Sequence, residues 1–511
     1  MASDKLADEA ALLPASGGVE PKKKRFGSSV GRNFLVNSTG TMVGLIVSFV
    51  TVPIYVHHIG DARYGVLSIV WLLLGYLGFL DLGLSRAATN ALARLDRSAD
   101  EERTRIVATS IILNLGFGAI GSLILYLGGS FLLDYIVSVP PDLRPEIEGN
   151  LVWVASLLPL ALISGVAIGT LEARERFIAA NVLQVIGSSA GQIIPVICAL
   201  LIAPNLSVVI PAAVLTRMFG VLLICAYVAL RNGPWVPTRP DMKTMRSLLG
   251  YGGWVTISGL VSPVLQSVDQ LVIGSILSVA AVTYYAVPMN LVIRSQVFAV
   301  ALARALFPRM SRVGATEGRD ISEQSLVALA YGYAMLCAPG ILLAQPFLAT
   351  WLSPSFAELG GPVARILLVG GWINGLAFIP FSLLQAKGRP DLPAKFHLLE
   401  IVPFIGVLWG LSSLFGLKGA ALAWSLRVIG DAGLLMAGAG MRIRMIKAIA
   451  PAAGLMGACF LVAELIPLSN LSAFAAGCVA ALINVGLAMI FSPLKLQMIL
   501  ASSAKLGRKA V

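Results

Sequence analysis

The chain has 511 residues, of which 57% are hydrophobic and only 13% are charged, and its mean hydropathy is +0.85. Soluble domains carry about 25% charged residues, so this chain lacks the polar side chains that a water-facing surface needs. The composition excludes a soluble enzyme, a fibre, a disordered chain and a nucleic-acid-binding protein, in spite of a net charge of +12. It predicts a polytopic α-helical membrane protein, because each spanning helix takes about 20 apolar residues.

Residues 1–30 predict a basic cytoplasmic tail rather than a signal peptide. The run Lys22-Lys23-Lys24-Arg25 precedes the first long apolar stretch, which extends from Phe34 to Val56. A signal peptide has a shorter apolar core followed by small residues at a cleavage site. This stretch is long enough to remain as a span, and basic residues beside a first span favour the cytoplasmic side.

Fourteen apolar segments predict fourteen membrane-spanning helices and an all-α fold. They lie near 34–57, 64–82, 106–128, 150–170, 177–203, 208–230, 248–270, 280–302, 323–345, 361–386, 395–415, 419–440, 448–467 and 472–491. Every second gap is basic, and with the two tails these gaps hold 31 of the 38 Lys and Arg residues. By the positive-inside rule both termini are expected in the cytoplasm.

The chain repeats itself after about 220 residues, which is the scale of transporter halves of six spans each. Span one follows Gly31-Arg32-Asn33-Phe34, and span seven follows Gly250-Tyr251-Gly252-Gly253-Trp254. The repeat predicts two pseudo-symmetric six-helix lobes and a C-terminal helix pair. The expected parts are the tail 1–30, an N-lobe 31–247 (spans 1–6), a C-lobe 248–447 (spans 7–12), spans 13–14 at 448–491 and a cytoplasmic tail 492–511.

Polar residues follow one face of each helix that opens a lobe. In span one they recur at steps of three and four: Asn37, Thr41, Gly44, Ser48, Thr51 and Tyr55. Span seven carries Ser258, Ser262, Gln266 and Asp269. Such stripes fit either close helix packing or the wall of a water-filled cavity, and their occurrence at corresponding places of a repeat favours the cavity.

Arginines within spans are the stronger signal, because a charge near the bilayer centre costs about 2.5–3.5 kcal/mol on insertion scales. Arg294, with Asn290 one turn before it, and Arg217 have no acidic residue at helical spacing. Both are candidates for binding an anion in a cavity, and structural pairing is the alternative. Arg63, at the outer mouth of span two, is a further candidate or an interfacial anchor. Arg427 has Asp431 four residues later, and a local ion pair accounts for it.

Four titratable residues are candidates for ion coupling or gating. His397 and Glu400 lie three residues apart on one face of span eleven, where they could carry a proton or form a structural hydrogen bond. Asp269 ends span seven on its outer side. Asp81 ends span two near the cytoplasm, where a helix cap or a gating ion pair would serve equally.

No enzymatic motif occurs in the sequence. It has no HExxH, no GxSxG, no Walker sequence and no CxxC pair, and its five cysteines lie inside apolar stretches. We therefore predict no catalytic residue, no metal site and no cofactor. A membrane-embedded glycan polymerase is the enzymatic alternative, but it would need a sizeable outer loop that this chain lacks.

Five short motifs stand out along the chain: Pro53-Ile54-Tyr55, Tyr64-Gly65-Val66, Phe79-Leu80-Asp81-Leu82-Gly83-Leu84, Asp269-Gln270-Leu271-Val272-Ile273-Gly274 and Leu384-Gln385-Ala386-Lys387-Gly388-Arg389. Together they resemble bacterial polysaccharide repeat-unit flippases, the Wzx-type members of the multidrug/oligosaccharidyl-lipid/polysaccharide exporter superfamily. The resemblance covers about residues 31–491.

The resemblance implies a V-shaped pair of lobes around a cationic cavity. Such proteins move undecaprenyl-diphosphate-linked oligosaccharide from the cytoplasmic to the periplasmic face of the bacterial inner membrane. Candidate partners are the lipid-linked glycan, a polysaccharide polymerase and a chain-length regulator. Arg294 matches the cavity arginine that these flippases place in span eight. A lipid II flippase and a multidrug or cation exporter of the same superfamily are the alternatives.

Overall fold

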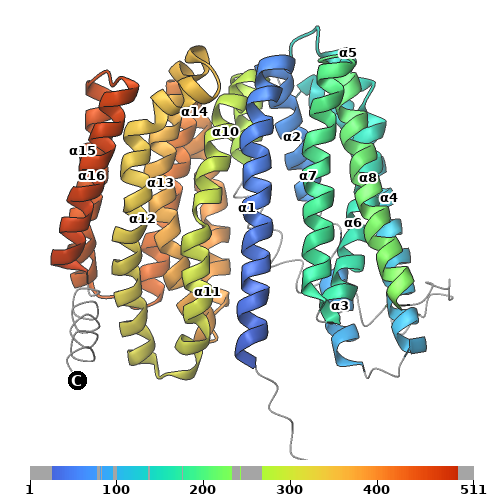
Figure 1. The fold of residues 1–511 in the computed structure, drawn as a ribbon, viewed down its shortest axis with the longest axis horizontal. Helices are drawn as coiled ribbons and strands as arrows, with labels where there is room; N and C mark the ends of the chain where they lie inside the picture. The colour runs from blue at the N-terminus through green and yellow to red at the C-terminus, as the bar shows by residue number, and fades with distance from the viewer. Residues whose placement is uncertain are drawn as a thin grey trace, which may run out of the picture.

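The computed structural model describes residues 26–77, 81, 83–95, 100–135, 139–174, 176–232, 242, 245 and 268–492, and all regular structure within them is helical (Figure 1). The helices are α1 (Phe26–Ile59), α2 (Asp61–Leu77), α3 (Leu84–Arg94), α4 (Asp100–Tyr135), α5 (Arg144–Glu148), α6 (Leu151–Ala173), α7 (Phe177–Leu201), α8 (Leu206–Asn232), α10 (Val279–Ser295), α11 (Val297–Arg312), α12 (Ala315–Trp351), α13 (Pro354–Ala386), α14 (Asp391–Gly438), α15 (Ile443–Leu465) and α16 (Asn470–Phe491).

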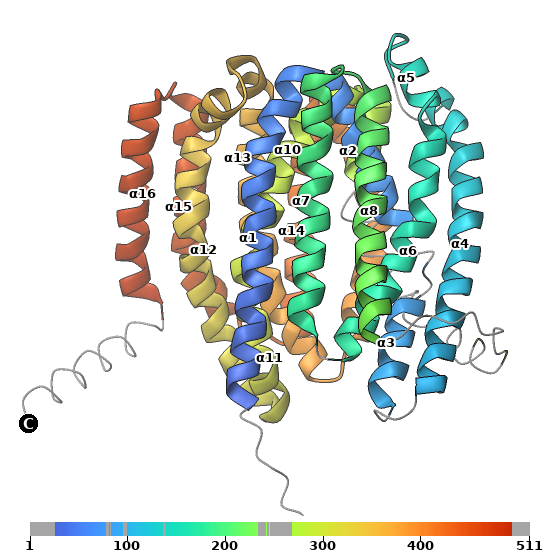
Figure 2. The same ribbon diagram turned by 45° about the vertical axis from the view of Figure 1, so that its right-hand side comes forward.

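The helices form two bundles side by side. Most helices of α1–α8, which we call the N-lobe, pack on one another, and so do most of α10–α14, the C-lobe, whereas α2 and α10 pack chiefly on each other between the lobes. Helices α15 and α16 pack on α12 at the edge of the C-lobe, and α4 lies at the opposite edge of the molecule (Figures 1 and 2). The junction of the predicted lobes, at residues 247 and 248, lies outside the described residues.

The prediction of an all-helical polytopic membrane protein is confirmed. Within the described residues, eleven helices are long and apolar enough to cross a membrane. One of them, α14, has 48 residues and contains two predicted spans. Helix α2 covers most of predicted span two, whose residues 78–80 and 82 lie outside the described residues. Most of predicted span seven lies outside the described residues, so the total of fourteen remains a prediction.

Gly416 divides α14 into two halves. Its φ of 58° and ψ of −136° are not helical, and a positive φ favours glycine because it has no Cβ. The chain reverses at this point, which falls in the predicted gap between spans eleven and twelve. As a result, residues 391–415 and 417–438 can lie against each other.

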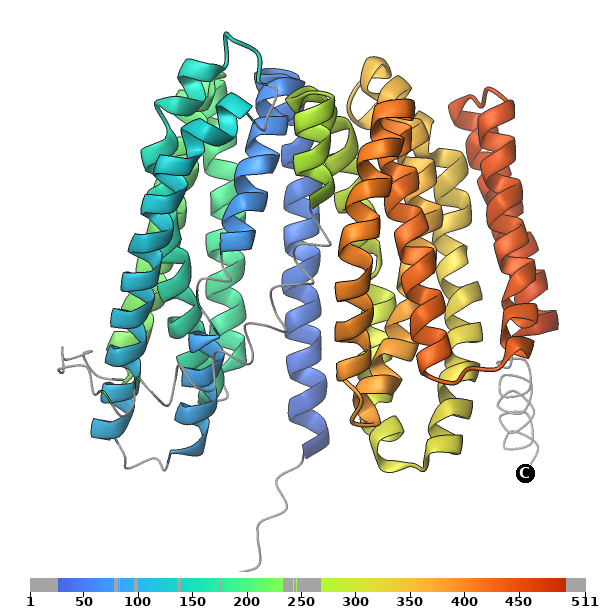
Figure 3. The ribbon, with the colours of Figure 1, turned by 180° about the vertical axis from the view of Figure 1, so that it is seen from behind.

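Two connectors contain helices that the sequence analysis treats as gaps. The outer connector after α4 holds α5, and the basic gap after α2 holds α3, whose apolar residues Leu84, Ala88 and Leu92 are buried. The start of α1, the α3–α4, α6–α7, α11–α12, α13–α14 and α14–α15 connectors and the end of α16 lie at the same end of the bundle, opposite α5 (Figures 1 and 3). We refer to the two ends as the α5 end and the α3 end.

The lobes meet at the α5 end, where the first turns of α2 and α10 pack together. The Thr283 hydroxyl donates a hydrogen bond to the Asp61 carbonyl over 2.6 Å, and the Tyr284 hydroxyl donates one to the Asp61 carboxylate. A Cβ added to Gly65 would lie 1.7 Å from the carbonyl oxygen of Val279. Only glycine allows so close an approach, and the lobes are therefore closed against each other at this end.

Candidate substrate cavity

A cavity of about 770 Å³ lies between the lobes. Helices α1, α2, α6, α7 and α8 of the N-lobe and α10 and α12 of the C-lobe line it, together with Gln270. Among its described lining residues two are charged, Arg217 and Arg294, and none is acidic. The cavity wall is therefore cationic, and its neutral part is a mixture of polar and aromatic side chains.

Arg294 occupies the last turn of α10, where the helix dipole favours a cation. Its Nη1 donates a hydrogen bond to the carbonyl of Gly44 on α1 over 3.2 Å, so it crosses from the C-lobe to the N-lobe. No acidic residue in the described part of the chain forms an ion pair with it. Asn290, one turn earlier, lines the same cavity. The remaining donors of the guanidinium are thus available to an anion.

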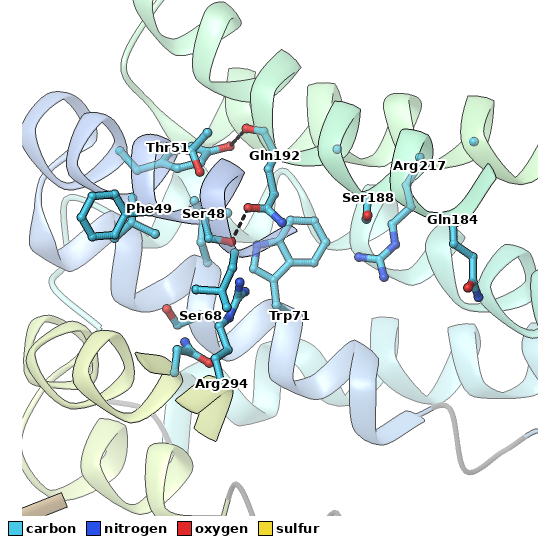
Figure 4. Close-up of a pocket in the computed structure, with 18 of the residues that line it drawn as sticks. Ser48, Phe49, Thr51, Ser68, Trp71, Gln184, Ser188, Gln192, Arg217 and Arg294 are labelled. Carbon is cyan, nitrogen blue, oxygen red and sulfur yellow. Dashed lines mark hydrogen bonds between the residues drawn. The ribbon is translucent and has the colours of Figure 1, made fainter. Parts of the chain in front are cut away.

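Arg217 reaches the cavity from α8, on the N-lobe side. Its guanidinium lies 5.4 Å from the ring centre of Trp71 on α2. A guanidinium that lies over an aromatic face is attracted to it and keeps its N–H groups free at the edge. Figure 4 shows Trp71 between the two arginines, with Arg294 on one side and Arg217 on the other.

The polar stripe of span one contributes to the cavity wall. Ser48, Thr51 and Tyr55 line it, and Gly44 contributes the carbonyl that holds Arg294. The side chains of Asn37 and Thr41 lie outside the described residues. In span seven Ser258, Ser262 and Gln266 are also outside them, and it is Gln270 rather than Asp269 that lines the cavity.

Arg63 does not line this cavity, contrary to its placement among the candidate cavity residues. It forms a two-pronged ion pair with Glu146 of α5, with Nε–Oε2 and Nη2–Oε1 distances of 3.0 and 2.5 Å. Glu146 also accepts a hydrogen bond from the backbone of Leu206. Arg63 therefore ties α2 to α5 and α8 at the α5 end, because a bidentate pair fixes both side chains.

Asp269 and Asp81 have structural partners. Asp269 is fully buried and accepts a hydrogen bond from the Tyr285 hydroxyl of α10. Asp81 accepts hydrogen bonds from the backbone N–H and the hydroxyl of Ser85, in the first turn of α3. These bonds hold the Asp81 side chain against the start of α3, whose N-cap residue is Gly83.

His397 and Glu400 pair across the bend of α14 rather than with each other. His397 Nε2 lies 3.4 Å from Asp431 Oδ1, and Glu400 Oε2 lies 3.6 Å from Nη1 of Arg427. The expected Arg427–Asp431 pair within one helix is therefore wrong. The turn at Gly416 brings the halves of α14 together, so each acidic residue finds its cation on the other half. All of this lies outside the cavity lining.

We predict that Arg427→Met strongly destabilises the protein. Glu400 and Asp431 are 8% and 5% exposed, and removing one partner of a buried pair costs about 3–5 kcal/mol because the remaining charge stays buried. The melting temperature of the detergent-solubilised protein measures this, and Arg427→Met/Glu400→Leu should recover part of the loss. Lys395→Gln, which breaks an exposed pair with Asp391, is the control and should change little. Equal melting temperatures for Arg427→Met and this control would contradict the buried pairing.

A family model described as "Polysaccharide biosynthesis protein" matches residues 30–313, more than half of the chain. The chain belongs to this family. The resemblance inferred from the short motifs is thereby confirmed.

Two curated relatives extend the match. This family member is 28% identical over 414 residues to the "Putative O-antigen transporter" of Shigella flexneri, covering 80% of this chain and 97% of that protein. It is 23% identical over 422 residues to the "Uncharacterized membrane protein EpsK" of Bacillus subtilis, covering 78% and 80%. Both relatives therefore extend into the C-lobe.

Two solved structures share the fold of this family member. The lipid II flippase MurJ, in an inward closed conformation, matches with a TM-score of 0.71 at 13% identity, over 89% of this chain and 98% of that one. A multidrug resistance MATE transporter of the MOP superfamily, in an inward-facing conformation, matches with 0.60 at 16% identity, over 82% and 99%. The chain thus has the fold that these two solved transporters share.

The part of the cavity wall that α2 and α7 provide is not among the predicted site residues. Ser68 and Trp71 lie on α2, and Gln184, Ser188 and Gln192 lie on α7. The three α7 residues are four apart, which places them on one face of the helix. This spacing is the same sequence signal that marks the polar stripe of span one.

Proposed function

We propose that this protein is a flippase that moves undecaprenyl-diphosphate-linked oligosaccharide repeat units from the cytoplasmic to the periplasmic face of the bacterial inner membrane. It would do so by alternating access, with the two lobes rocking around the cavity between them. The α5 end, where α2 and α10 meet, is the closed side in this structure.

The observation that carries the proposal is the pair of cavity arginines that have no acidic partner among the described residues. A guanidinium binds phosphate oxygens with two parallel hydrogen bonds. Arg294 and Arg217 stand on different lobes, so a lipid-linked glycan in the cavity would face a cation on each lobe. The neutral polar wall around them suits a substrate whose remaining part is uncharged or weakly charged.

We infer that the α3 end faces the cytoplasm. The connectors and the adjoining helix ends on this side carry basic residues, among them Arg174, Arg176, Arg309, Arg312 and Arg319, and the cytoplasmic side of a membrane protein is enriched in Lys and Arg. Both termini would then be cytoplasmic. A polysaccharide polymerase and a chain-length regulator would act on the glycan after it reaches the α5 end.

The charge of the cavity argues against a drug or cation exporter. Such a protein attracts its cargo with acidic side chains, and none lines the described part of this cavity. A lipid II flippase would share the anionic head group, so the cavity charge alone does not separate it from the proposal. The identity of the transported glycan separates the two functions.

Deletion of the gene tests the proposal. We expect one undecaprenyl-diphosphate-linked oligosaccharide to accumulate on the inner face of the membrane, and the wild-type gene to clear it. Mass spectrometry of the lipid extract identifies the glycan, and its accessibility to a periplasmic enzyme reports its side. Accumulation of lipid II would assign the chain to peptidoglycan instead, and normal levels of all lipid-linked glycans would refute the flippase.

A further inference from the structure

One face of α7 presents neutral polar groups to the cavity. Gln184, Ser188 and Gln192 follow each other at steps of four. A Cβ added to Gly187 would lie 3.6 Å from Gly220 of α8, whereas nothing lies within 4 Å of a Cβ added to Gly191. The backbone of α7 is therefore open to the cavity at Gly191, and a ligand can approach it closely there.

The three polar residues differ in how far their hydrogen bonding is already satisfied. The Ser48 hydroxyl donates to the side-chain oxygen of Gln192 over 2.7 Å, and the Tyr55 hydroxyl donates to its backbone carbonyl over 3.3 Å. Gln192 thus fixes α7 to α1. The Ser188 hydroxyl contacts only the carbonyl of Val185 in its own helix, and Gln184 makes no hydrogen bond within the described residues. Both side chains are exposed to the cavity.

Gln184 and Ser188 lie beside the Arg217–Trp71 stack. Figure 4 shows both on the Arg217 side of the cavity, away from Arg294. An amide offers donors and an acceptor, a hydroxyl offers both, and a stacked guanidinium offers donors at its edge. The flat Trp71 ring adds an apolar surface with a defined orientation. Sugars combine hydroxyl groups with apolar ring faces, and this set of groups matches them.

We propose that Gln184, Ser188 and Trp71 form a glycan subsite that selects the sugar attached to the diphosphate. The inference rests on the proposed function. It assigns the diphosphate to Arg294 and Asn290 on the C-lobe and the first sugar to α7 and α2 on the N-lobe. A substrate with both parts then bridges the lobes, whereas a bare prenyl diphosphate occupies the C-lobe part alone. Sites that hydrogen-bond a hydroxyl discriminate strongly against ligands that lack it.

Binding to the full-length protein in lipid nanodiscs tests the subsite. The probes are farnesyl diphosphate and farnesyl diphosphate linked to N-acetylglucosamine, glucose or galactose, and calorimetry gives each Kd. For the wild type we expect at least one sugar to tighten binding about tenfold, as two neutral hydrogen bonds would. Gln184→Leu/Ser188→Ala should remove this gain while the Kd for farnesyl diphosphate changes less than about threefold. Ser189→Ala, next to the subsite but outside the cavity lining, should leave all values unchanged.

Three results would contradict parts of this assignment. If no sugar on the panel tightens binding to the wild type, or if the double variant keeps the full gain, the subsite is wrong. If the double variant weakens farnesyl diphosphate as much as Arg294→Gln does, α7 belongs to the anion site and the division between the lobes is wrong. If Arg294→Gln leaves the Kd for farnesyl diphosphate unchanged, the anion site of the proposed function fails, while the sugar-dependent gain is still measured independently.

Discussion

Arg294→Ala should abolish export while the protein still inserts and folds. The side chain lines the cavity and its single contact in the described residues is a hydrogen bond to the Gly44 carbonyl, so its loss leaves no buried charge behind. Two charge-assisted hydrogen bonds to the substrate would disappear, at about 1.5 kcal/mol or more each, which reduces transport by about a hundredfold or more. Complementation of a deletion strain measures export, and the amount of protein in the membrane reports insertion.

Two further variants separate charge from geometry at this position. Arg294→Lys keeps the charge but loses the two-pronged geometry, and we expect partial activity. Arg304→Ala removes an exposed arginine of α11 outside the cavity lining, and we expect export close to that of the wild type. Full activity of Arg294→Ala would remove this residue from the site.

Gly65→Ala should drive the lobes apart at the α5 end and stop transport. The added Cβ would lie 1.7 Å from the backbone oxygen of Val279, and a backbone atom cannot rotate away as a side chain does. Overpacking costs about 2 kcal/mol, which shifts the ratio of closed to open molecules by about thirtyfold. The hydrogen bonds of Thr283 and Tyr284 to Asp61 would open with it.

Distances between spin labels at the α5 end measure this shift. His57 of α1 and Ser355 of α13 are exposed there, and both are replaced by cysteine in a protein whose five native cysteines have been changed to serine. We expect longer distances for Gly65→Ala. Gly116→Ala is the matched control, because nothing lies within 4 Å of the added Cβ on α4. Unchanged distances for Gly65→Ala would show that the α2–α10 contact does not close the lobes.

A functional residue can be recognised from the sequence when the free energy of inserting its side chain depends only on its depth in the membrane. Arg294 and Arg217 are expensive wherever their helices point within a bilayer, and both line the cavity. The same holds for the polar stripe of α1, because helical periodicity alone places Ser48, Thr51 and Tyr55 on one face. For such residues, the sequence predicts that they face something other than lipid.

Ion pairs between different helical segments depend instead on the tertiary structure. His397 and Glu400 share a helix face, and so do Arg427 and Asp431, yet each pairs with a residue of the opposite half of α14. The local spacing is compatible with both sets of pairs, and only the reversal at Gly416 selects between them. The partner of Arg63 is equally hidden in the sequence, because Glu146 lies 83 residues away on the short helix α5, which the sequence does not predict.

By itself, the sequence determined that this is a helical membrane protein with a basic α3 end and cationic residues within its spans. These properties follow from transfer free energies, which add residue by residue along the chain. The tertiary structure decided which arginines face the cavity, that Gln184 and Ser188 stand beside Arg217, and that α2 meets α10 at Gly65. These contacts join segments that are far apart in sequence. They depend on how the apolar faces of different helices pack, and the sequence of a single helix does not determine that packing.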